Sequence, residues 1–256
     1  MKADFRQRWA VPVCIGIVVL LVGGGSAAYA LFLTPSAETT YPTKPSTLTN
    51  ESVAKYVTEY EEAYLMDEID EPGAETSVFC DATMDVRTER GFYGLVTCEA
   101  SVDRGNSVLD LPHMVTAYFV NDTATERIGR FGSSGYRRLG RDIVPDSPAD
   151  GNASTRNGSA SLRAYNFASE TANVTIRIAS IDSSAVPSTT TNYSVPPAGG
   201  VVETDDAVRR GTYRVEVEPE RGETKTRNWT VGEPPSQELL VYVTPNGSVA
   251  VATVGR

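Results

Sequence analysis

The longest apolar pattern of the chain lies near its N-terminus. Trp9 to Leu33 is a stretch of 25 residues without a charged side chain, and about 20 such residues cross a bilayer as a helix. Basic residues precede this stretch: Lys2, Arg6 and Arg8. The positive-inside rule therefore predicts a single-pass transmembrane helix over 9–33, with a cytoplasmic tail at 1–8 and the bulk of the chain extracellular.

A cleaved signal peptide is the alternative interpretation of this segment. The small-residue pattern Ala28-Tyr29-Ala30 resembles a cleavage site, and cleavage after Ala30 would make the protein secreted. Leu31 to Leu33 continue the apolar run beyond that site, which favours an anchor. Both interpretations place the rest of the chain on the exported side of the membrane.

A short spacer and a helix are predicted next. Residues 34–48 are rich in Thr, Ser and Pro and predict an extended stalk. Thr49 or Asn50 can cap the N-terminus of a following helix. Apolar positions then recur at spacings of three and four: Val53, Tyr56, Val57, Tyr60 and Tyr64. This stripe predicts a helix that packs on a sheet, with a solvated acidic side that includes Glu61.

Alternation with a period of two predicts a β-hairpin after the helix. Cys80 and Cys98 each lie nine residues from Glu89, in a segment with turn character. A hairpin that turns there brings four apolar or small pairs face to face: Cys80–Cys98, Ala82–Val96, Met84–Gly94 and Val86–Phe92. In an oxidising compartment this register predicts a disulfide between Cys80 and Cys98. Together with the helix, the hairpin predicts an α+β domain with an antiparallel sheet over 49–142.

The pattern changes after residues 143–159, which contain few apolar residues and predict a linker. From 160 to 256, alternating runs recur between turn residues: Ser161–Phe167, Asn173–Ile181, Thr190–Val195, Gly200–Thr204, Gly211–Val217, Thr224–Val231, Glu238–Val243 and Ser248–Val254. About eight strands in this length predict an antiparallel, all-β sandwich.

The charge of the chain bears on its environment. The formal net charge is −10, and residues 1–33 carry +2, so the remaining chain carries −12. It also contains few lysines, and such an acidic surface stays soluble where salt screens charge strongly. This composition indicates that the protein comes from a salt-adapted organism. The alternative is an ordinary acidic protein encoded by a GC-rich genome. The negative charge argues against nucleic acid as a partner.

Asparagines are concentrated in glycosylation sequons. Eight of the ten head an Asn-x-Ser/Thr sequence: Asn50, Asn121, Asn152, Asn157, Asn173, Asn192, Asn228 and Asn246. Serine and threonine make up 48 of the 256 residues, so about two sequons are expected by chance. The excess predicts N-glycosylation on the exported side. Asn173 and Asn228 lie in strand-like runs, and we expect these two sequons to carry no glycan.

No residue pattern predicts a catalytic, cofactor-binding or metal-binding site. The only histidine, His113, has no Ser or Cys partner suggested by the sequence, so we expect a packing or surface role. One segment, residues 127–141, is rich in arginine: Arg127, Arg130, Arg137, Arg138 and Arg141. We expect these arginines to pair with the protein's own acidic residues. The alternative is that they bind an anionic patch on a partner or a lipid.

Two further patterns carry a resemblance to a known family. Gly211-Thr212-Tyr213 resembles the tyrosine corner of immunoglobulin-like domains, in which the hydroxyl of Tyr213 would bond back to the preceding chain. With the acidic, lysine-poor composition and the helix around Val57-Thr58-Glu59-Tyr60, the chain resembles the membrane-anchored, Ig-like-domain surface proteins of halophilic archaea. The resemblance implies an architecture and no functional residue.

These patterns together predict an exported, N-glycosylated surface protein with a non-enzymatic structural or interaction role. Its expected partners are the lipid bilayer, through residues 9–33, and envelope proteins or glycans. One alternative is an accessory subunit that binds a ligand or partner for a membrane complex. A second alternative, an extracellular hydrolase, is disfavoured because nothing pairs a nucleophile with a base.

Overall fold

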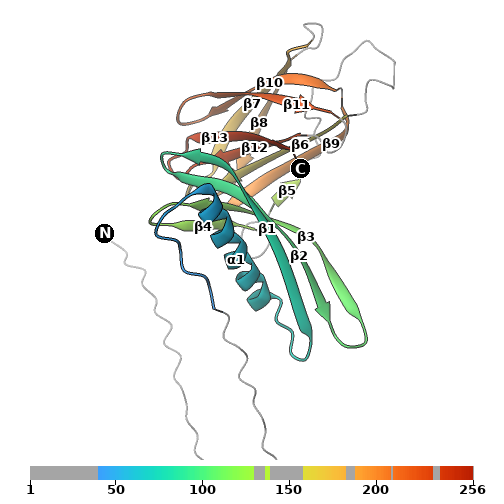
Figure 1. Cartoon of the computed structure of the whole chain (residues 1–256). Helices are drawn as coiled ribbons and strands as arrows, with labels where there is room; N and C mark the ends of the chain where they lie inside the picture. Colours follow the sequence, from blue (N-terminus) through green and yellow to red (C-terminus); the bar gives the residue numbers. More distant parts are fainter. Residues whose placement is uncertain are drawn as a thin grey trace, which may run out of the picture. The chain divides into compact units, whose positions relative to one another are not determined.

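The described residues form one helix followed by strands that assemble into three sheets (Figure 1). The computed structural model describes residues 40–129, 136–138, 158–182, 188–208, 210–232 and 237–255. All of them belong to one compact unit that spans Thr39–Arg256. The predicted membrane segment at 9–33 lies outside the described residues. Within the described part, no helix is long and apolar enough to cross a membrane.

The first sheet carries the helix on one face, and we call it the helix-backed sheet. Helix α1 spans Asn50–Glu68. Four antiparallel strands follow and are neighbours in chain order: β1 (Glu75–Thr88), β2 (Gly91–Asp103), β3 (Val108–Val120) and β4 (Thr125–Ile128). Thr49 caps the helix, because its Oγ1 accepts from the Ser52 N–H at 3.1 Å while the Ser52 Oγ accepts from the Thr49 N–H at 2.9 Å. The predicted start of the helix is confirmed.

The predicted apolar stripe of α1 does face the sheet. Val53, Tyr56 and Val57 are buried, and Tyr60 and Tyr64 are partly buried against the same cluster. The strands contribute the other side of this core: Cys80, Phe92, Val96, Cys98, Ala100, Met114, Tyr118 and Val120. The stripe therefore serves packing, as its spacing predicts.

The described part of the predicted stalk, residues 40–48, contains no helix or strand and contacts the folded unit. The ring of Tyr41 lies 5.2 Å from that of Tyr60, and the Lys44 Nζ donates to the Asn121 carbonyl at 3.1 Å. Leu48 packs against the core under α1. These residues thus lie along the helix-backed sheet and its helix.

The remaining strands form a sandwich of two sheets. The outer sheet has the order β11-β10-β7-β8, and the inner sheet has the order β13-β12-β6-β9-β5. Their bounds are β5 (Tyr136–Arg138), β6 (Gly158–Asn166), β7 (Ala172–Ser180), β8 (Thr189–Val195), β9 (Gly199–Val208), β10 (Gly211–Pro219), β11 (Lys225–Val231), β12 (Gln237–Val243) and β13 (Val249–Gly255). Each of the eight strands predicted between 160 and 256 is present.

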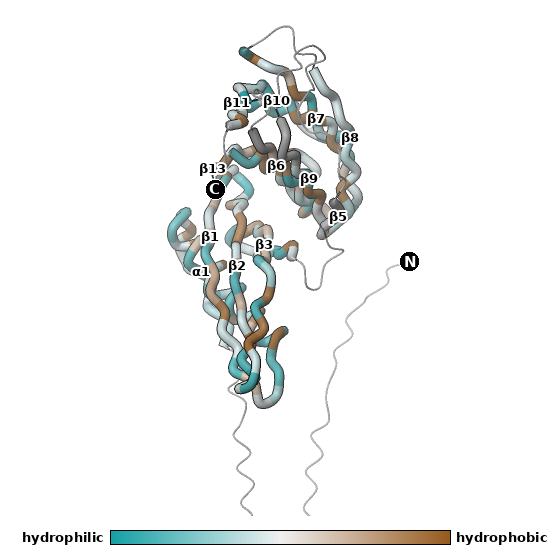
Figure 2. The backbone as a smooth tube through the Cα atoms, turned by 90° about the vertical axis from the view of Figure 1, so that its right-hand side faces the viewer, coloured by the Kyte–Doolittle hydropathy of each residue, from teal (hydrophilic) through white to brown (hydrophobic). Residues whose placement is uncertain are grey.

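Alternation explains the core of the sandwich. In β7 the buried residues are Val174, Ile176 and Ile178, and in β10 Val215 and its neighbours two positions away are buried. Figure 2 shows hydrophobic and hydrophilic residues alternating along such strands. The prediction of a purely antiparallel sandwich was wrong, because β12 runs parallel to β6 and β5 runs parallel to β9.

The predicted hairpin is confirmed over most of its length. Cys80 pairs with Cys98, and the predicted register continues to the pair Met84–Gly94. A bulge between Met84 and Val86 then shifts the register, so Val86 lies opposite Tyr93 and not opposite Phe92. The extra residue lies on β1, where it bends the strand locally and increases its twist.

The helix-backed sheet and the inner sheet share an aromatic core. The ring of Tyr93 lies 4.8 Å from that of Phe119 and 5.6 Å from that of Tyr242. The Tyr242 hydroxyl donates to the Asp85 carboxylate at 2.7 Å. The open face of the helix-backed sheet is therefore covered near the β1–β2 turn, where both faces of β2 are buried.

Candidate functional site

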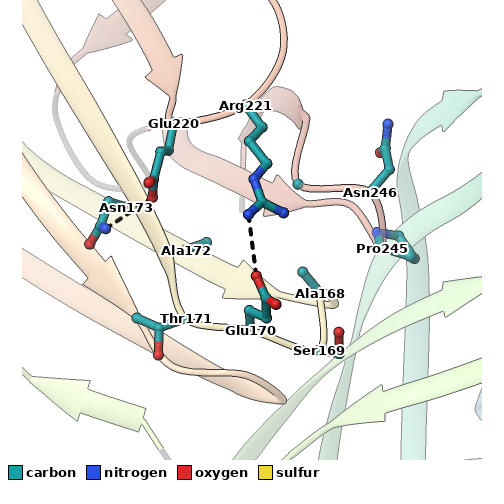
Figure 3. Close-up of a pocket in the computed structure, with 11 residues that line it drawn as sticks. Ala168, Ser169, Glu170, Thr171, Ala172, Asn173, Glu220, Arg221, Pro245 and Asn246 are labelled. Atoms are coloured by element: carbon teal, nitrogen blue, oxygen red, sulfur yellow. Dashed lines mark hydrogen bonds and ion pairs between the residues drawn. The ribbon is translucent and has the colours of Figure 1, made fainter.

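A polar pocket of about 410 Å³ lies where three connections of the sandwich meet (Figure 3). These are the β6–β7 connection, the β10–β11 turn and the β12–β13 turn. The pocket is lined by Ala168, Ser169, Glu170, Thr171, Ala172, Asn173, Glu220, Arg221, Pro245, Asn246 and Gly247. Loops at one end of a sandwich are a common place for binding sites, so we treat this pocket as the candidate site.

Asn166 fixes the shape of the first connection. Its buried side chain donates from Nδ2 to the Glu170 carbonyl at 2.8 Å and to the Val195 carbonyl at 2.9 Å. Its Oδ1 accepts from the Ala168 N–H at 2.9 Å. Asn166 is outside the sequons, and these three bonds give it a structural role instead.

The polar side chains of the pocket bind one another. Glu170 and Arg221 form an ion pair at 3.4 Å, and both side chains are about 70% exposed, so the pair contributes at most about 1 kcal/mol. The Asn173 Nδ2 donates to the Glu220 carboxylate at 3.1 Å. The lining contains no histidine or cysteine. The arrangement offers charged and polar groups to a polar ligand.

Three sequon asparagines lie on the outward face of the outer sheet. Asn173, Asn192 and Asn228 are exposed in β7, β8 and β11, while their neighbours Tyr193 and Trp229 point into the core. The strands β8 and β11 are the two edges of this sheet. Asn173 and Asn228 are exposed although they lie in strands. Burial therefore gives no reason to expect these two sequons to be unoccupied.

The other described sequons lie at the ends of elements. Asn50 is the first residue of α1 and is exposed, and Asn246 is exposed in the β12–β13 turn. Asn121 is half-buried in the β3–β4 turn, where its Oδ1 accepts from the N–H groups of Thr123 and Ala124. Asn152 and Asn157 lie outside the described residues. Glycosylation at these positions stays a prediction.

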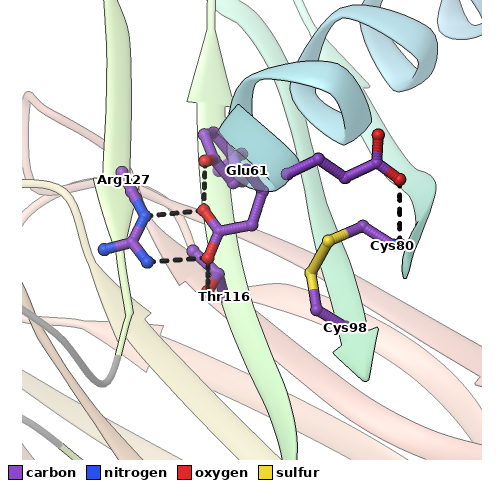
Figure 4. Close-up of a disulfide and its surroundings, with 7 residues drawn as sticks. Glu61, Cys80, Cys98, Thr116 and Arg127 are labelled. Atoms are coloured by element: carbon purple, nitrogen blue, oxygen red, sulfur yellow. Dashed lines mark hydrogen bonds and ion pairs between the residues drawn. A yellow bond between two sulfur atoms is a disulfide. The ribbon is translucent and has the colours of Figure 1, made fainter. Parts of the chain in front are cut away.

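The disulfide predicted from the hairpin register is present. Cys80 and Cys98 are bonded through their sulfurs and are buried beneath α1 (Figure 4). The Cys80 N–H points away from β2 and donates to the Glu62 carboxylate at 3.1 Å. Glu62 thereby occupies a backbone donor on the outer edge of β1, where another strand could otherwise pair.

The prediction that Glu61 lies on a solvated side of α1 was wrong, because its side chain is fully buried (Figure 4). Two hydroxyls donate to its carboxylate, from Thr116 at 2.8 Å and from Tyr118 at 2.5 Å. The Arg127 guanidinium donates to both oxygens at 2.6 Å and lies 3.8 Å from the Tyr64 ring. This cluster joins α1 to β3 and β4, and both oxygens of the buried carboxylate have hydrogen-bond partners.

The surroundings of this cluster shift two pKa values. Burial, followed by the charge of Glu61, raises the pKa of the Tyr118 hydroxyl, which therefore stays neutral and donates. Burial alone would lower the pKa of Arg127, but the hydrogen bonds and charge of Glu61 outweigh it and raise that pKa. A neutral Tyr118 hydroxyl and a charged Arg127 guanidinium are the forms that donate hydrogen bonds to Glu61.

The remaining predicted residues are dispersed. His113 lies on the surface of β3, with its Nε2 3.4 Å from the Glu99 carboxylate. Within the part of the chain that the structure describes, no group of three or more His, Cys, Asp or Glu could hold a metal ion. Of the Arg-rich segment, Arg127 pairs with the protein's own acid as predicted. The side chains of the others, Arg130, Arg137, Arg138 and Arg141, lie outside the description.

Tyr213 is buried in β10, and its ring centre lies 6.5 Å from that of Trp229. The backbone before it is described, except at Arg209, but the side chains of 205–209 are not. The hydrogen bond of a tyrosine corner therefore stays a prediction. Val215, two residues later, is fully buried in the core.

Comparison with known protein families identifies part of the sandwich. The family model of the halobacterial Ig-like domain matches residues 170–256, about a third of the chain. No curated protein and no solved structure matches. The match supports an Ig-like protein of halophilic archaea, and an Ig-like sandwich is consistent with a non-enzymatic surface or structural protein.

Proposed function

We propose that this chain is an exported, N-glycosylated cell-surface protein with a non-enzymatic structural or interaction role. Residues 9–33 anchor it as a single-pass helix, with the N-terminus in the cytoplasm and the folded unit outside. Its partners are the bilayer and envelope proteins or glycans. The Ig-like match agrees with such a protein and leaves export and glycosylation as part of the proposal.

One observation carries the proposal: the sequons are enriched and their asparagines are accessible. Eight of ten asparagines head a sequon, and five of the six described ones are exposed. An oligosaccharide needs a surface asparagine on the exported side. The disulfide adds independent support, because structural disulfides persist in oxidising compartments.

Intact glycopeptide mass spectrometry of the chain from its native membranes tests the proposal. We expect glycan mass on peptides that contain Asn192, Asn228 or Asn246. Substituting each of these asparagines by Gln should remove the corresponding glycan and leave the others. Asn106 is exposed and outside any sequon, so Asn106→Gln is the matched control and should change no glycan.

The proposal would be contradicted by unmodified peptides at every sequon in protein isolated from the membrane.

Anchoring is tested separately by the N-terminal peptide of the same preparation. A peptide that includes residues 2–8 supports the anchor, whereas a chain that begins at Leu31 in the medium supports cleavage after Ala30.

A second candidate function, an accessory subunit that binds a polar ligand, is favoured by the pocket of about 410 Å³ between the three connections. A small polar ligand bound there would raise the thermal unfolding temperature of the chain. Glu170→Gln with Arg221→Gln should abolish that rise. The absence of any shift across a broad panel of sugars, amino acids and salts would count against this function.

A further inference from the structure

The open face of the helix-backed sheet is covered over only part of its length. Near the β1–β2 turn this face packs on the inner sheet through Tyr93, Leu95 and Phe119. The strands β1, β2 and β3 continue past that contact to their other ends, beside the β2–β3 turn (Figure 1). We call this uncovered part the distal face, and it lies opposite α1.

The register of the three strands defines the rows of the distal face. Phe79 lies opposite Glu99, and a bulge in β3 brings His113 beside Glu99. The next row is Ser77–Ser101–Asp110, in which the two serine hydroxyls are hydrogen-bonded at 2.8 Å. The last row is Glu75–Asp103–Val108. The side chains of these rows point away from α1, because Cys80 and Ala100 between them pack beneath it.

Large apolar side chains are exposed on the distal face. Phe79 is 71% exposed and Val108 is 63% exposed. A groove of about 440 Å³ runs between Phe79 and His113 over the middle rows. Scattered apolar residues are normal on a surface, but a groove with an aromatic wall that continues a packed interface favours docking.

The charge of the distal face is strongly one-sided. Five exposed carboxylates belong to it: Glu75, Asp81, Glu99, Asp103 and Asp110. His113 is the one basic side chain in the three rows. A second copy of the same face would bring ten carboxylates together, and this repulsion opposes self-association there.

Sequons are absent from this region, although the chain contains eight of them. None lies between Asn50 and Asn121, whereas the outer sheet exposes three. A bound protein and a glycan would compete for the same surface. The sequon-free distal face therefore stays accessible whether or not the other sites carry glycans.

We propose that the distal face docks a partner protein through a basic surface with an apolar centre. The apolar residue enters the groove beside Phe79, and Lys or Arg side chains of the partner meet Glu99, Asp110 and their neighbours. Arginine suits these contacts, because its fork donates to a carboxylate through two parallel hydrogen bonds. This assignment does not depend on export or on glycosylation.

Site-specific photo-crosslinking in intact cells tests the docking surface. A benzoylphenylalanine replaces Phe79 in one full-length variant and Val108 in another. The matched control carries the same group at Thr226, which is exposed on the outer sheet. We expect one polypeptide adduct from both distal positions and none from Thr226, with Lys or Arg in the crosslinked peptide of the partner. Adding Glu99→Gln with Asp110→Asn should reduce the adduct about tenfold.

Each other outcome overturns the proposal. Adducts no stronger than those from Thr226, adducts to lipid, to a second copy, or to an acidic peptide would each do so, as would an adduct insensitive to the two carboxylate substitutions. Folding of every variant is verified by far-UV circular dichroism and an unchanged thermal unfolding midpoint, so loss of an adduct cannot be ascribed to unfolding.

Discussion

Glu61 offers a sharp test of how α1 is attached to its sheet. Glu61→Gln keeps the shape of the side chain and removes the negative charge that lies beside the Arg127 guanidinium, which is 13% exposed. Removing one partner of a buried ion pair costs about 3–5 kcal/mol. A glutamine oxygen can still accept from Thr116 or Tyr118, so we expect a loss near the lower end, about 3 kcal/mol. For a chain of this size that lowers Tm by roughly 6–12 °C.

The assay is thermal and denaturant unfolding of the full chain in detergent, followed by far-UV circular dichroism. Glu59→Gln is the matched control, because Glu59 lies one half-turn away and pairs with Lys55 only at the surface. It should change the unfolding free energy by less than about 0.5 kcal/mol. In a double-mutant cycle with Arg127→Met, the coupling should reach about 1–3 kcal/mol. Equal effects of Glu61→Gln and Glu59→Gln would refute a buried, paired Glu61.

Three further predictions follow from other parts of the structure. Replacing Cys80 and Cys98 by Ser should lower the unfolding free energy by about 3 kcal/mol, measured by denaturant unfolding, and an unchanged midpoint would contradict this. If glycosylated, Asn192 and Asn228 shield both edges of the outer sheet, so substituting both by Gln should cause self-association in light scattering, unlike Asn246→Gln. Because burial raises the pKa of Tyr118 in the folded state, the contribution of this hydroxyl to stability should be constant below about pH 9 and should be lost above pH 10, where the unfolded chain loses this proton. Tyr118→Phe should reduce the fall in unfolding free energy above pH 10.

Local periodicity accounts for most of the elements. The period of two between 160 and 256 identifies all eight strands there, because each buries one face in the sandwich core. The register of Cys80 and Cys98 was predictable because a tight turn fixes the pairing of the strands that it joins. The capping residue Thr49 marks the start of α1 for an equally local reason.

Features that depend on distant partners could not be predicted in the same way. Glu61 is hydrophilic, and only contacts with β3 and β4 make its burial favourable. Its spacing of four from Val57 and from Leu65, both fully buried, is the one local signal that could have revealed its position. The parallel pairing of β6 with β12 joins segments more than 70 residues apart, and no local pattern encodes it.

The candidate pocket was missed for the same reason. Glu170, Arg221 and Asn246 come from three connections, and none of the three carries a recognisable motif by itself. Asn166, which orders the first connection, is notable in the sequence only as an asparagine outside the sequons.

The most direct test of the proposed surface location uses the few lysines of the chain. Intact cells are treated with a membrane-impermeant amine reagent, and the labelled positions are mapped by mass spectrometry. Lys55 and Lys225 have exposed side chains in the folded unit, whereas Lys2 precedes the predicted anchor. The account predicts labels on Lys55 and Lys225 in intact cells and on Lys2 only after lysis. Labelling of Lys55 and Lys225 only after lysis would contradict it.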